Sequence, residues 1–162
     1  MGSASWLSSD FPWEDEWTYA LTDSDIGELE SALGTAPASP SKIGDENFPL
    51  PTPGVRIKEW KETIVSGRGF VRMRNIPVKR WSEIETARAF WAIGQHLGLP
   101  GAHNGAGDLI GHVRDQRLGR DVYVRQYKTA EEIRFHCDAA DAVGLLYLQR
   151  AQAGGESRIV SS

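Results

Sequence analysis

The chain has 162 residues, 40% of them hydrophobic and 25% charged, and a formal net charge of −4 at pH 7. This composition predicts a soluble globular domain with one core and excludes a chain that is disordered throughout. The acidic balance argues against nucleic acid as a partner, because phosphate binding needs a concentrated basic surface. No apolar run approaches the roughly 18 residues of a membrane helix, so no membrane association is expected.

Two further observations concern the cellular compartment. The N-terminus does not combine a basic region with a following apolar stretch, so we expect no secretory signal there. The chain has one cysteine, which excludes an intramolecular disulfide and fits a reducing compartment. We therefore expect a cytoplasmic protein.

Residues 1–55 are predicted to form an N-terminal arm and a helix, separate from the domain that follows at residues 56–162. Acidic and aromatic residues alternate at the start, and we expect this arm to pack over the domain. Its aromatic residues are Trp6, Phe11, Trp13 and Trp17. A helix is predicted over residues 25–33, where Ile26, Leu29 and Leu33 share one face and Gly34 follows as a stop.

The next part of the chain is predicted to alternate helix and strand. A short helix fits residues 57–65, and residues 70–76 alternate apolar and basic side chains with the period of a half-buried strand. Ser82 and Glu85 make a capping box that opens a further helix, ended by Gly98. The side chains predicted to face inward from this helix are Ile84, Ala87, Phe90, Trp91 and Leu97.

Beyond residue 108 the pattern changes to consecutive strands. The predicted strands cover residues 109–113, 122–127, 133–138, 143–149 and 157–160. A part with helices followed by consecutive strands is typical of an α+β or mainly β fold.

The segment from Arg134 to Asp138 carries the main candidate for chemistry. In a strand, His136 and Asp138 project from the same face, so both can reach one metal ion. They would supply two members of the two-His-one-carboxylate triad that binds non-haem Fe(II). Cys137 points to the opposite face in this arrangement and is expected to be a small buried hydrophobe. The alternative is that His136 is an ordinary hydrogen-bonded core residue.

The order of several motifs resembles the Fe(II)/2-oxoglutarate-dependent dioxygenases of the TauD/TfdA-like family, in the form common in fungi. The resemblance covers about residues 54 to 162 and rests on GRGFVRMRNIPV, FWAIGQHLG, GDLIGHVRD, RFHCDAADAVGLLYLQRA and GGESRIVSS. It implies a double-stranded β-helix (jelly-roll) core with N-terminal helices. This chain would supply the first strands only, as the N-terminal portion of such a domain without its C-terminal half.

The resemblance also implies roles for individual residues. His136 and Asp138 would be the first two iron ligands, and Ser157, after Gly154 and Gly155, would help to bind the carboxylate of 2-oxoglutarate. By themselves the two glycines are an ordinary turn and Ser157 an ordinary strand residue. The third histidine and the arginine that pairs with the far carboxylate of 2-oxoglutarate have no counterpart before Ser162.

Two loop residues, His103 and Asn104, are candidates for substrate binding near the mouth of the site, or plain polar loop residues. Of the other histidines, His96 and His112 precede the motif and do not match the family's order.

Three functional hypotheses follow. The chain belongs to a dioxygenase that uses Fe(II), 2-oxoglutarate and O2 on a small organic substrate, and its missing ligand comes from elsewhere. Otherwise it is a non-catalytic fragment or interaction module, or a cupin-like metal-binding protein that does not use 2-oxoglutarate. An incomplete barrel leaves strand edges uncovered, so we expect self-association.

Overall fold

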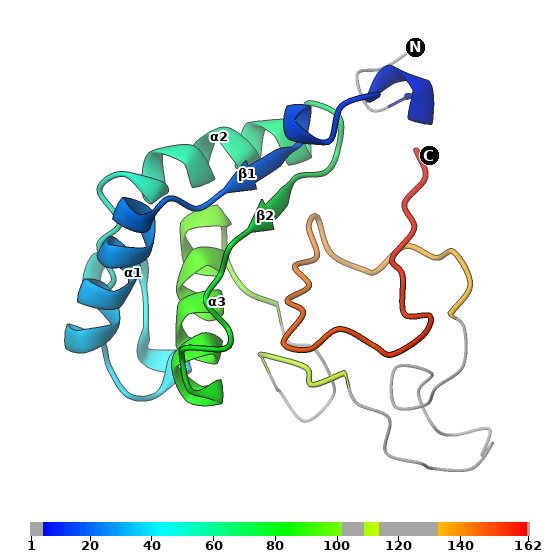
Figure 1. The fold of residues 1–162 in the computed structure, drawn as a ribbon. Helices are drawn as coiled ribbons and strands as arrows, with labels where there is room; N and C mark the ends of the chain where they lie inside the picture. Colours follow the sequence, from blue (N-terminus) through cyan, green and yellow to red (C-terminus); the bar gives the residue numbers. More distant parts are fainter. Residues whose placement is uncertain (1–4, 102–108, 114–132, 162) are drawn as a thin grey trace.

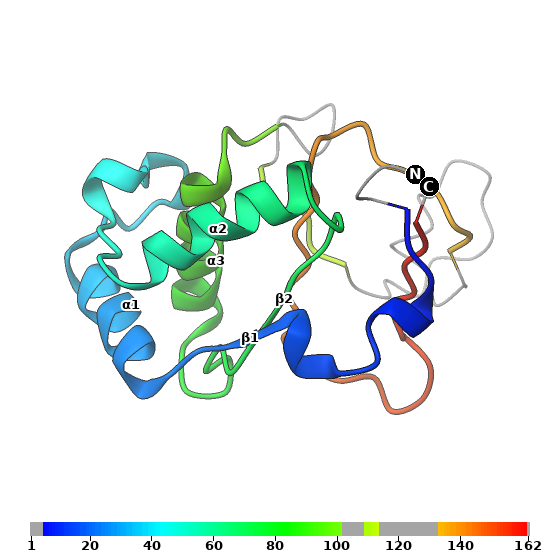
Figure 2. The ribbon, with the colours of Figure 1, turned by 90° about the horizontal axis from the view of Figure 1, so that it is seen from above.

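The computed structural model describes residues 5–101, 109–113 and 133–161. Three α-helices and a two-stranded sheet form its N-terminal part, and residues 109–113 and 133–161 run beside them without regular secondary structure (Figure 1). Seen from above in Figure 2, the helices lie on one side of the short sheet and the C-terminal segments on the other. Among the described helices, none combines the length and apolarity needed to cross a membrane.

Helix α1 (Asp23–Thr35) confirms the first predicted helix and is capped at its start. The Thr22 hydroxyl accepts a hydrogen bond from the backbone N–H of Asp25, and the Asp25 carboxylate accepts one from the N–H of Thr22. This reciprocal pair satisfies two backbone donors that have no partner within the helix. The helix continues to Thr35, so Gly34 is not the stop that the sequence predicted.

Helix α2 (Pro53–Val65) begins four residues before the predicted start. Pro53 is the first helical residue, where its missing N–H costs nothing and its fixed φ suits the helix. Ile57 and Trp60 are buried, and Ile64 on the same stripe is half-buried.

Helix α3 (Glu83–Leu97) begins at the predicted capping box of Ser82 and Glu85, and Gly98 follows its end as expected. The prediction that Ile84 faces inward is wrong, because this residue is 68% exposed. The helix buries Thr86, and Ile84 stands two residues away, roughly 200° around the axis, on the opposite face.

The sheet pairs strand β1 (Thr18–Ala20) with strand β2 (Arg72–Arg74) in parallel. Thr18 lies opposite Arg72 and Ala20 opposite Arg74. Strand β2 confirms a strand near the predicted position but is shorter than residues 70–76. Strand β1 was not predicted, since three residues are too few for a periodic signal to be read.

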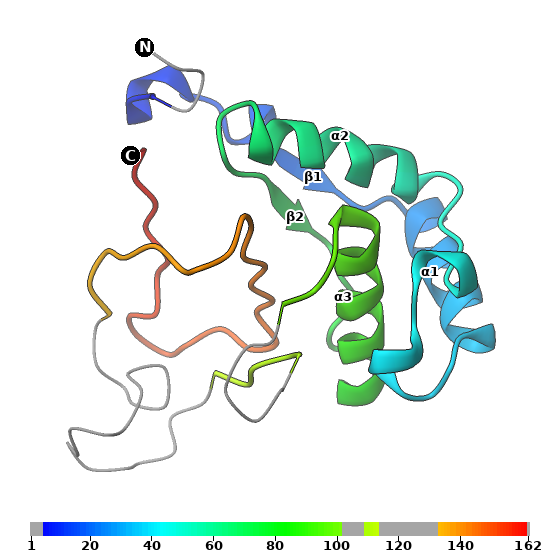
Figure 3. The same cartoon turned by 180° about the vertical axis from the view of Figure 1, so that it is seen from behind.

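The core lies between the three helices and the sheet, and α3 packs against both α1 and α2 (Figure 3). Its buried side chains all come from residues 21–93: Leu21, Leu29, Ala32, Leu33, Ile43, Phe48, Leu50, Ile57, Trp60, Trp81, Ala89, Trp91, Ala92 and Ile93. Residues on both sides of the predicted boundary at residue 55 belong to this cluster. The division into an arm region and a domain stays a prediction.

The strands predicted at residues 109–113, 133–138, 143–149 and 157–160 are wrong for this structure, because the backbone there has no strand pairing. The strand predicted at residues 122–127 lies outside the described residues. A strand needs a hydrogen-bonded neighbour and a covered apolar face. The apolar side chains of these segments are instead largely exposed, among them Val143, Leu145 and Ile159 at 56–63%. The described residues therefore show the helical part of the expected fold and no double-stranded β-helix.

Candidate functional site

His136 and Asp138 approach each other although they are not on a strand. The Nε2 atom of His136 lies 3.7 Å from Oδ1 of Asp138, and both side chains are a little over half exposed. The predicted placement on one face of a strand is therefore wrong in its secondary structure. The convergence of the imidazole and the carboxylate is nevertheless present.

A backbone hydrogen bond sets the direction of the His136 ring. Its Nδ1 atom lies 2.8 Å from the carbonyl oxygen of Arg134. A carbonyl oxygen can only accept, so Nδ1 carries the proton and donates it. In the neutral ring, Nε2 then holds a free lone pair, and this atom is the one that faces Asp138. A histidine that ligates a metal has its other ring nitrogen bound to a backbone carbonyl or carboxylate in the same way.

The pair fits two adjacent positions around a metal ion after a small adjustment. Two donors at 2.0–2.2 Å from one ion, at a right angle, are about 3 Å apart. The observed 3.7 Å therefore has to shorten by roughly 0.7 Å, which exposed side chains can do by small χ rotations. A neutral nitrogen and an anionic oxygen suit Fe(II). In the part of the chain that the structure describes, no third His, Cys, Asp or Glu joins them.

The other histidines are used elsewhere or not described. Nε2 of His96, on α3, hydrogen-bonds the carbonyl of Phe48 at 2.9 Å inside the helical part. His112 lies beside the start of α3, with Nδ1 3.8 Å from a carboxylate oxygen of Glu83. His103 and Asn104, the predicted substrate-binding residues, lie outside the described residues. Neither described histidine completes a ligand set with His136.

Cys137 corrects another expectation. Its side chain was predicted to be buried behind the two ligands, but it is exposed. The reason is that no second layer of the protein covers residues 133–138 among the described residues, which are exposed throughout this segment.

Ser157 lies beyond the predicted turn and has a partner that sequence reasoning missed. Gly154 and Gly155 have φ of 69° and 77°, in the left-handed region that glycine adopts without strain. The turn lets the hydroxyl of Ser157 hydrogen-bond the hydroxyl of Tyr147. Ser157 and His136 were each expected on a strand, and this part of the prediction is wrong because neither residue is on one. The only signal for Tyr147 was its phenol within an otherwise apolar run.

Comparison with known proteins places these segments in a family. The family model described as "Taurine catabolism dioxygenase TauD, TfdA family" matches residues 34–162. The chain belongs to this family. The match includes His136, Asp138, Gly154, Gly155 and Ser157, and it leaves out the N-terminal arm. The resemblance inferred from the ordered motifs is thus confirmed, and the TauD/TfdA family is a family of jelly-roll dioxygenases.

Two curated relatives are similar along almost the whole chain. FR-33289 synthase of Streptomyces rubellomurinus is 28% identical over 166 residues, which cover 99% of this chain and 49% of the relative. Taurine hydroxylase-like protein SAT17 of Stachybotrys chartarum is 24% identical over 170 residues, covering 98% of this chain and 44% of the relative. The chain spans about half the length of these relatives.

Proposed function

We propose that this chain is the part of an Fe(II)- and 2-oxoglutarate-dependent dioxygenase that supplies the first two iron ligands, His136 and Asp138. The observation that carries the proposal is the approach of His136 Nε2 to Asp138 Oδ1, with Nδ1 engaged by the Arg134 carbonyl. Membership of the TauD/TfdA family supports it. The substrate class is a small organic molecule with an oxidisable C–H bond.

Each of these residues has a defined task. His136 binds as the neutral imidazole and Asp138 as the carboxylate, which together neutralise one of the two positive charges of the ion. The Ser157 hydroxyl donates a hydrogen bond to a carboxylate oxygen of 2-oxoglutarate. When bound, Fe(II) and 2-oxoglutarate supply the activation of O2, with 2-oxoglutarate converted to succinate and carbon dioxide.

Because His136 and Asp138 are exposed, we expect their role in catalysis to depend on additional protein that covers the site. Dioxygen chemistry needs a site from which water is excluded, and here both side chains are over half exposed. Two protein ligands also hold a metal less firmly than three. We therefore expect the residues shown here to bind metal weakly and to need a further histidine and a covering layer for turnover. In the described part of the chain, neither His96 nor His112 joins the pair, so these two histidines give the cupin-like alternative no support.

Metal binding by the chain tests the two ligands directly. We expect Co(II), a spectroscopic substitute for Fe(II), to bind weakly and to produce visible absorption bands. His136→Ala and Asp138→Ala should abolish these bands, because each removes one of only two protein ligands. The matched controls are His112→Ala and Asp141→Ala, which remove the same side chains elsewhere on the exposed surface. Equal loss of binding in the controls would contradict the assignment.

The genomic sequence after the codon for Ser162 provides a second test. An open reading frame that encodes a later histidine, followed by an arginine, would supply the third ligand and the partner for the far carboxylate of 2-oxoglutarate. A frame without either residue would favour the non-catalytic alternative.

A further inference from the structure

The last described residue, Ser161, is in direct contact with Trp6 near the start of the described chain. The Ser161 hydroxyl donates a hydrogen bond to the backbone carbonyl of Trp6 at 2.9 Å, across 155 positions of sequence. The first and last described segments of the chain lie on the same side of the molecule in Figures 1 and 2. Trp6 is itself fixed, since its indole N–H donates to the carbonyl of Arg68 at 2.9 Å, just before strand β2.

Aromatic packing holds Trp6 in this place. Its ring centroid lies 5.2 Å from that of Phe70 and 5.7 Å from that of Phe11, and Phe11 and Phe70 are 5.4 Å apart. The tilted and edge-on geometries are those that aromatic pairs prefer. The Arg68 guanidinium stands over Phe70 at 5.6 Å and adds a cation–π contact. The carbonyl that receives Ser161 is therefore anchored to the chain leading into β2.

The C-terminal segment has few other attachments. Within residues 133–161, only Leu146 and Ser161 are partly buried, and the remaining side chains are exposed. Near Leu146, the backbone of Gly144 lies against Phe90 of α3, so closely that an added Cβ would be 3.3 Å from the ring. Two places thus attach this segment to the other described residues, and Ser157 lies between them.

We propose that Trp6 is a positioning residue, which anchors the segment bearing Ser157 and thereby sets the affinity for the dicarboxylate cosubstrate. The proposal rests on the function proposed above for Ser157. It assigns a role to the N-terminal arm, which precedes residue 34, where the family match begins. Ser161 is four residues from Ser157, so a fixed Ser161 restricts the range over which the Ser157 hydroxyl can move.

Limited trypsin digestion of the 162-residue chain tests the anchor. Trypsin cleaves after Arg158, between Ser157 and Ser161, and cleavage requires local release of this segment. We expect Trp6→Ala to raise the initial rate of cleavage after Arg158 about tenfold or more. The matched control is Trp13→Ala, which removes a 66% exposed tryptophan from the same arm and should change the rate less than about twofold.

Cleavage after Lys58, within helix α2, reports general unfolding in the same samples. It should be unchanged in Trp6→Ala. Ser161→Ala removes only the hydrogen bond and leaves the aromatic packing in place, and we expect a rise of about two- to tenfold after Arg158. Equal rates after Arg158 in wild type, Trp6→Ala and Ser161→Ala would overturn the proposal. A parallel rise after Lys58 in Trp6→Ala, with no effect of Ser161→Ala, would overturn it as well.

Turnover by the product of the complete gene tests the positioning role. Trp6→Ala should raise the KM for 2-oxoglutarate several-fold with little change in kcat, whereas Trp13→Ala should change neither. A general loss of folded protein would lower the apparent kcat instead. An unchanged KM would overturn the role of Trp6. Failure of the proposed function can be told apart from failure of this inference. In that case the wild type would not consume 2-oxoglutarate, while the cleavage rates after Arg158 would still differ between the wild type and Trp6→Ala.

Discussion

The buried carboxylate of one residue, Asp25, fixes the start of α1. This side chain is 2% exposed, and its Oδ2 accepts hydrogen bonds from the Tyr19 hydroxyl and from both the N–H and the hydroxyl of Thr22. Burial alone would raise the pKa of Asp25, but the hydrogen bonds from Thr22 and Tyr19 outweigh it and the pKa is lowered. Burial and the hydrogen bond to Asp25 raise the pKa of Tyr19. The carboxylate joins strand β1 to helix α1.

Asp25→Asn should lower the free energy of unfolding at pH 7 by roughly 1–3 kcal/mol, because the acceptor loses its charge. A lowered pKa in the folded protein means that the carboxylate stabilises the fold fully above its unfolded pKa of about 3.9. This contribution is lost as the pH falls through the lower, folded pKa. The difference between wild type and Asp25→Asn in urea unfolding should therefore shrink toward zero at acid pH.

Asp23→Asn is the control, since Asp23 is an exposed acid in the same first turn and loses the same charge. It should cost only a few tenths of a kcal/mol. An equal effect of both substitutions would attribute the stabilisation to the helix dipole instead of the Asp25 hydrogen bonds.

Ser157 provides the test of the cosubstrate site. In the product of the complete gene, Ser157→Ala should raise the apparent KM for 2-oxoglutarate, consistent with the loss of a hydrogen bond to a charged group, roughly 1.5–3 kcal/mol. Ser161→Ala and Tyr147→Phe help to separate direct from indirect effects, since Tyr147 only contacts the hydroxyl of Ser157. A KM unchanged by Ser157→Ala would remove this residue from the site.

At the scale of elements, the sequence predicted all three helices, but of the strands expected in the described residues only β2 is present. The capping box at Ser82 and the periodic apolar residues are local signals, and the helices they predict are present. Strand β1 forms only because β2, 54 positions away, supplies its partner. The segments at residues 133–161 have strand-like patterns, but pattern alone does not provide a neighbouring strand. The same limit applies to His136 and Asp138, whose approach was predicted and whose strand was not observed.

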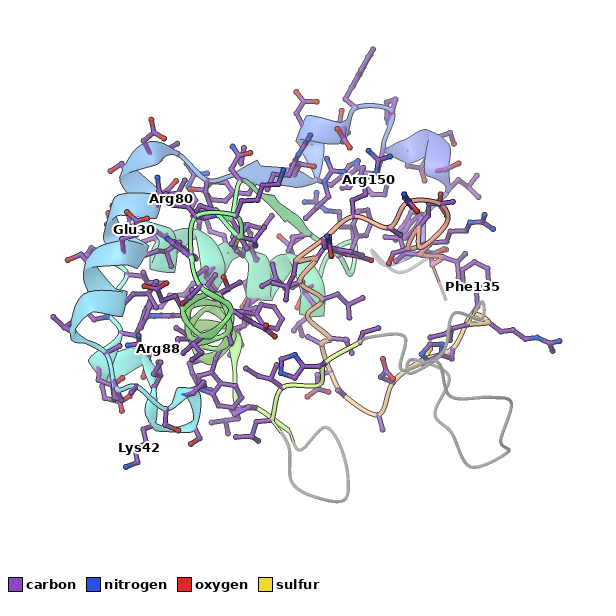
Figure 4. All side chains as sticks on the ribbon, turned by 60° about the horizontal axis from the view of Figure 1, so that its bottom comes forward. Glu30, Lys42, Arg80, Arg88, Phe135 and Arg150 are labelled. Atoms are coloured by element: carbon purple, nitrogen blue, oxygen red, sulfur yellow. The ribbon has the colours of Figure 1, made fainter. Side chains whose placement is uncertain are left out.

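Arg88 shows how one side chain connects two of these elements. Its guanidinium, on α3, donates to the carbonyls of Leu33, Ala36 and Pro37 at 2.6–3.0 Å, at the C-terminal end of α1. These carbonyls have no partner within the helix, and a cation there also complements the helix dipole. In Figure 4, Arg88 is on α3, and Arg80 and Glu30 form a separate pair.

Arg88→Ala should lower the free energy of unfolding by roughly 2–3 kcal/mol, since it leaves helix-end carbonyls without a donor. Arg80→Ala is the matched control, because the ion pair of Arg80 with Glu30 is exposed, with side chains 60% and 41% accessible. An exposed pair contributes about 0–1 kcal/mol. The free energies of unfolding of both variants can be measured by urea denaturation. Equal decreases in the two variants would show that Arg88 does not hold α1 and α3 together.

The whole molecule is divided between a packed helical part and an uncovered C-terminal part. Among the described residues, the buried hydrophobic side chains lie at residues 21–93, whereas most large apolar side chains at residues 133–160 are 41–64% exposed. In Figure 4, Phe135 lies on the far side of the molecule from the helices. The sequence pattern had predicted strands in these segments. Their burial depends on strands that pair with them, and in the described residues no such strands are present.

This uncovered surface predicts the behaviour of the 162-residue chain in solution. Exposed apolar patches and unpaired backbone favour association, so we expect concentration-dependent oligomers in sedimentation velocity experiments. The chain supplied with Fe(II), ascorbate and 2-oxoglutarate should form no succinate, because the described residues provide only two metal ligands, on an exposed surface. Val143→Ser with Leu145→Ser should reduce the association, since these side chains are 56% and 63% exposed. Val55→Ser, which changes a 58% exposed valine on α2, should leave it unchanged. A homogeneous monomer that produces succinate in a metal-dependent way would show that the described residues do not need further protein to complete the site.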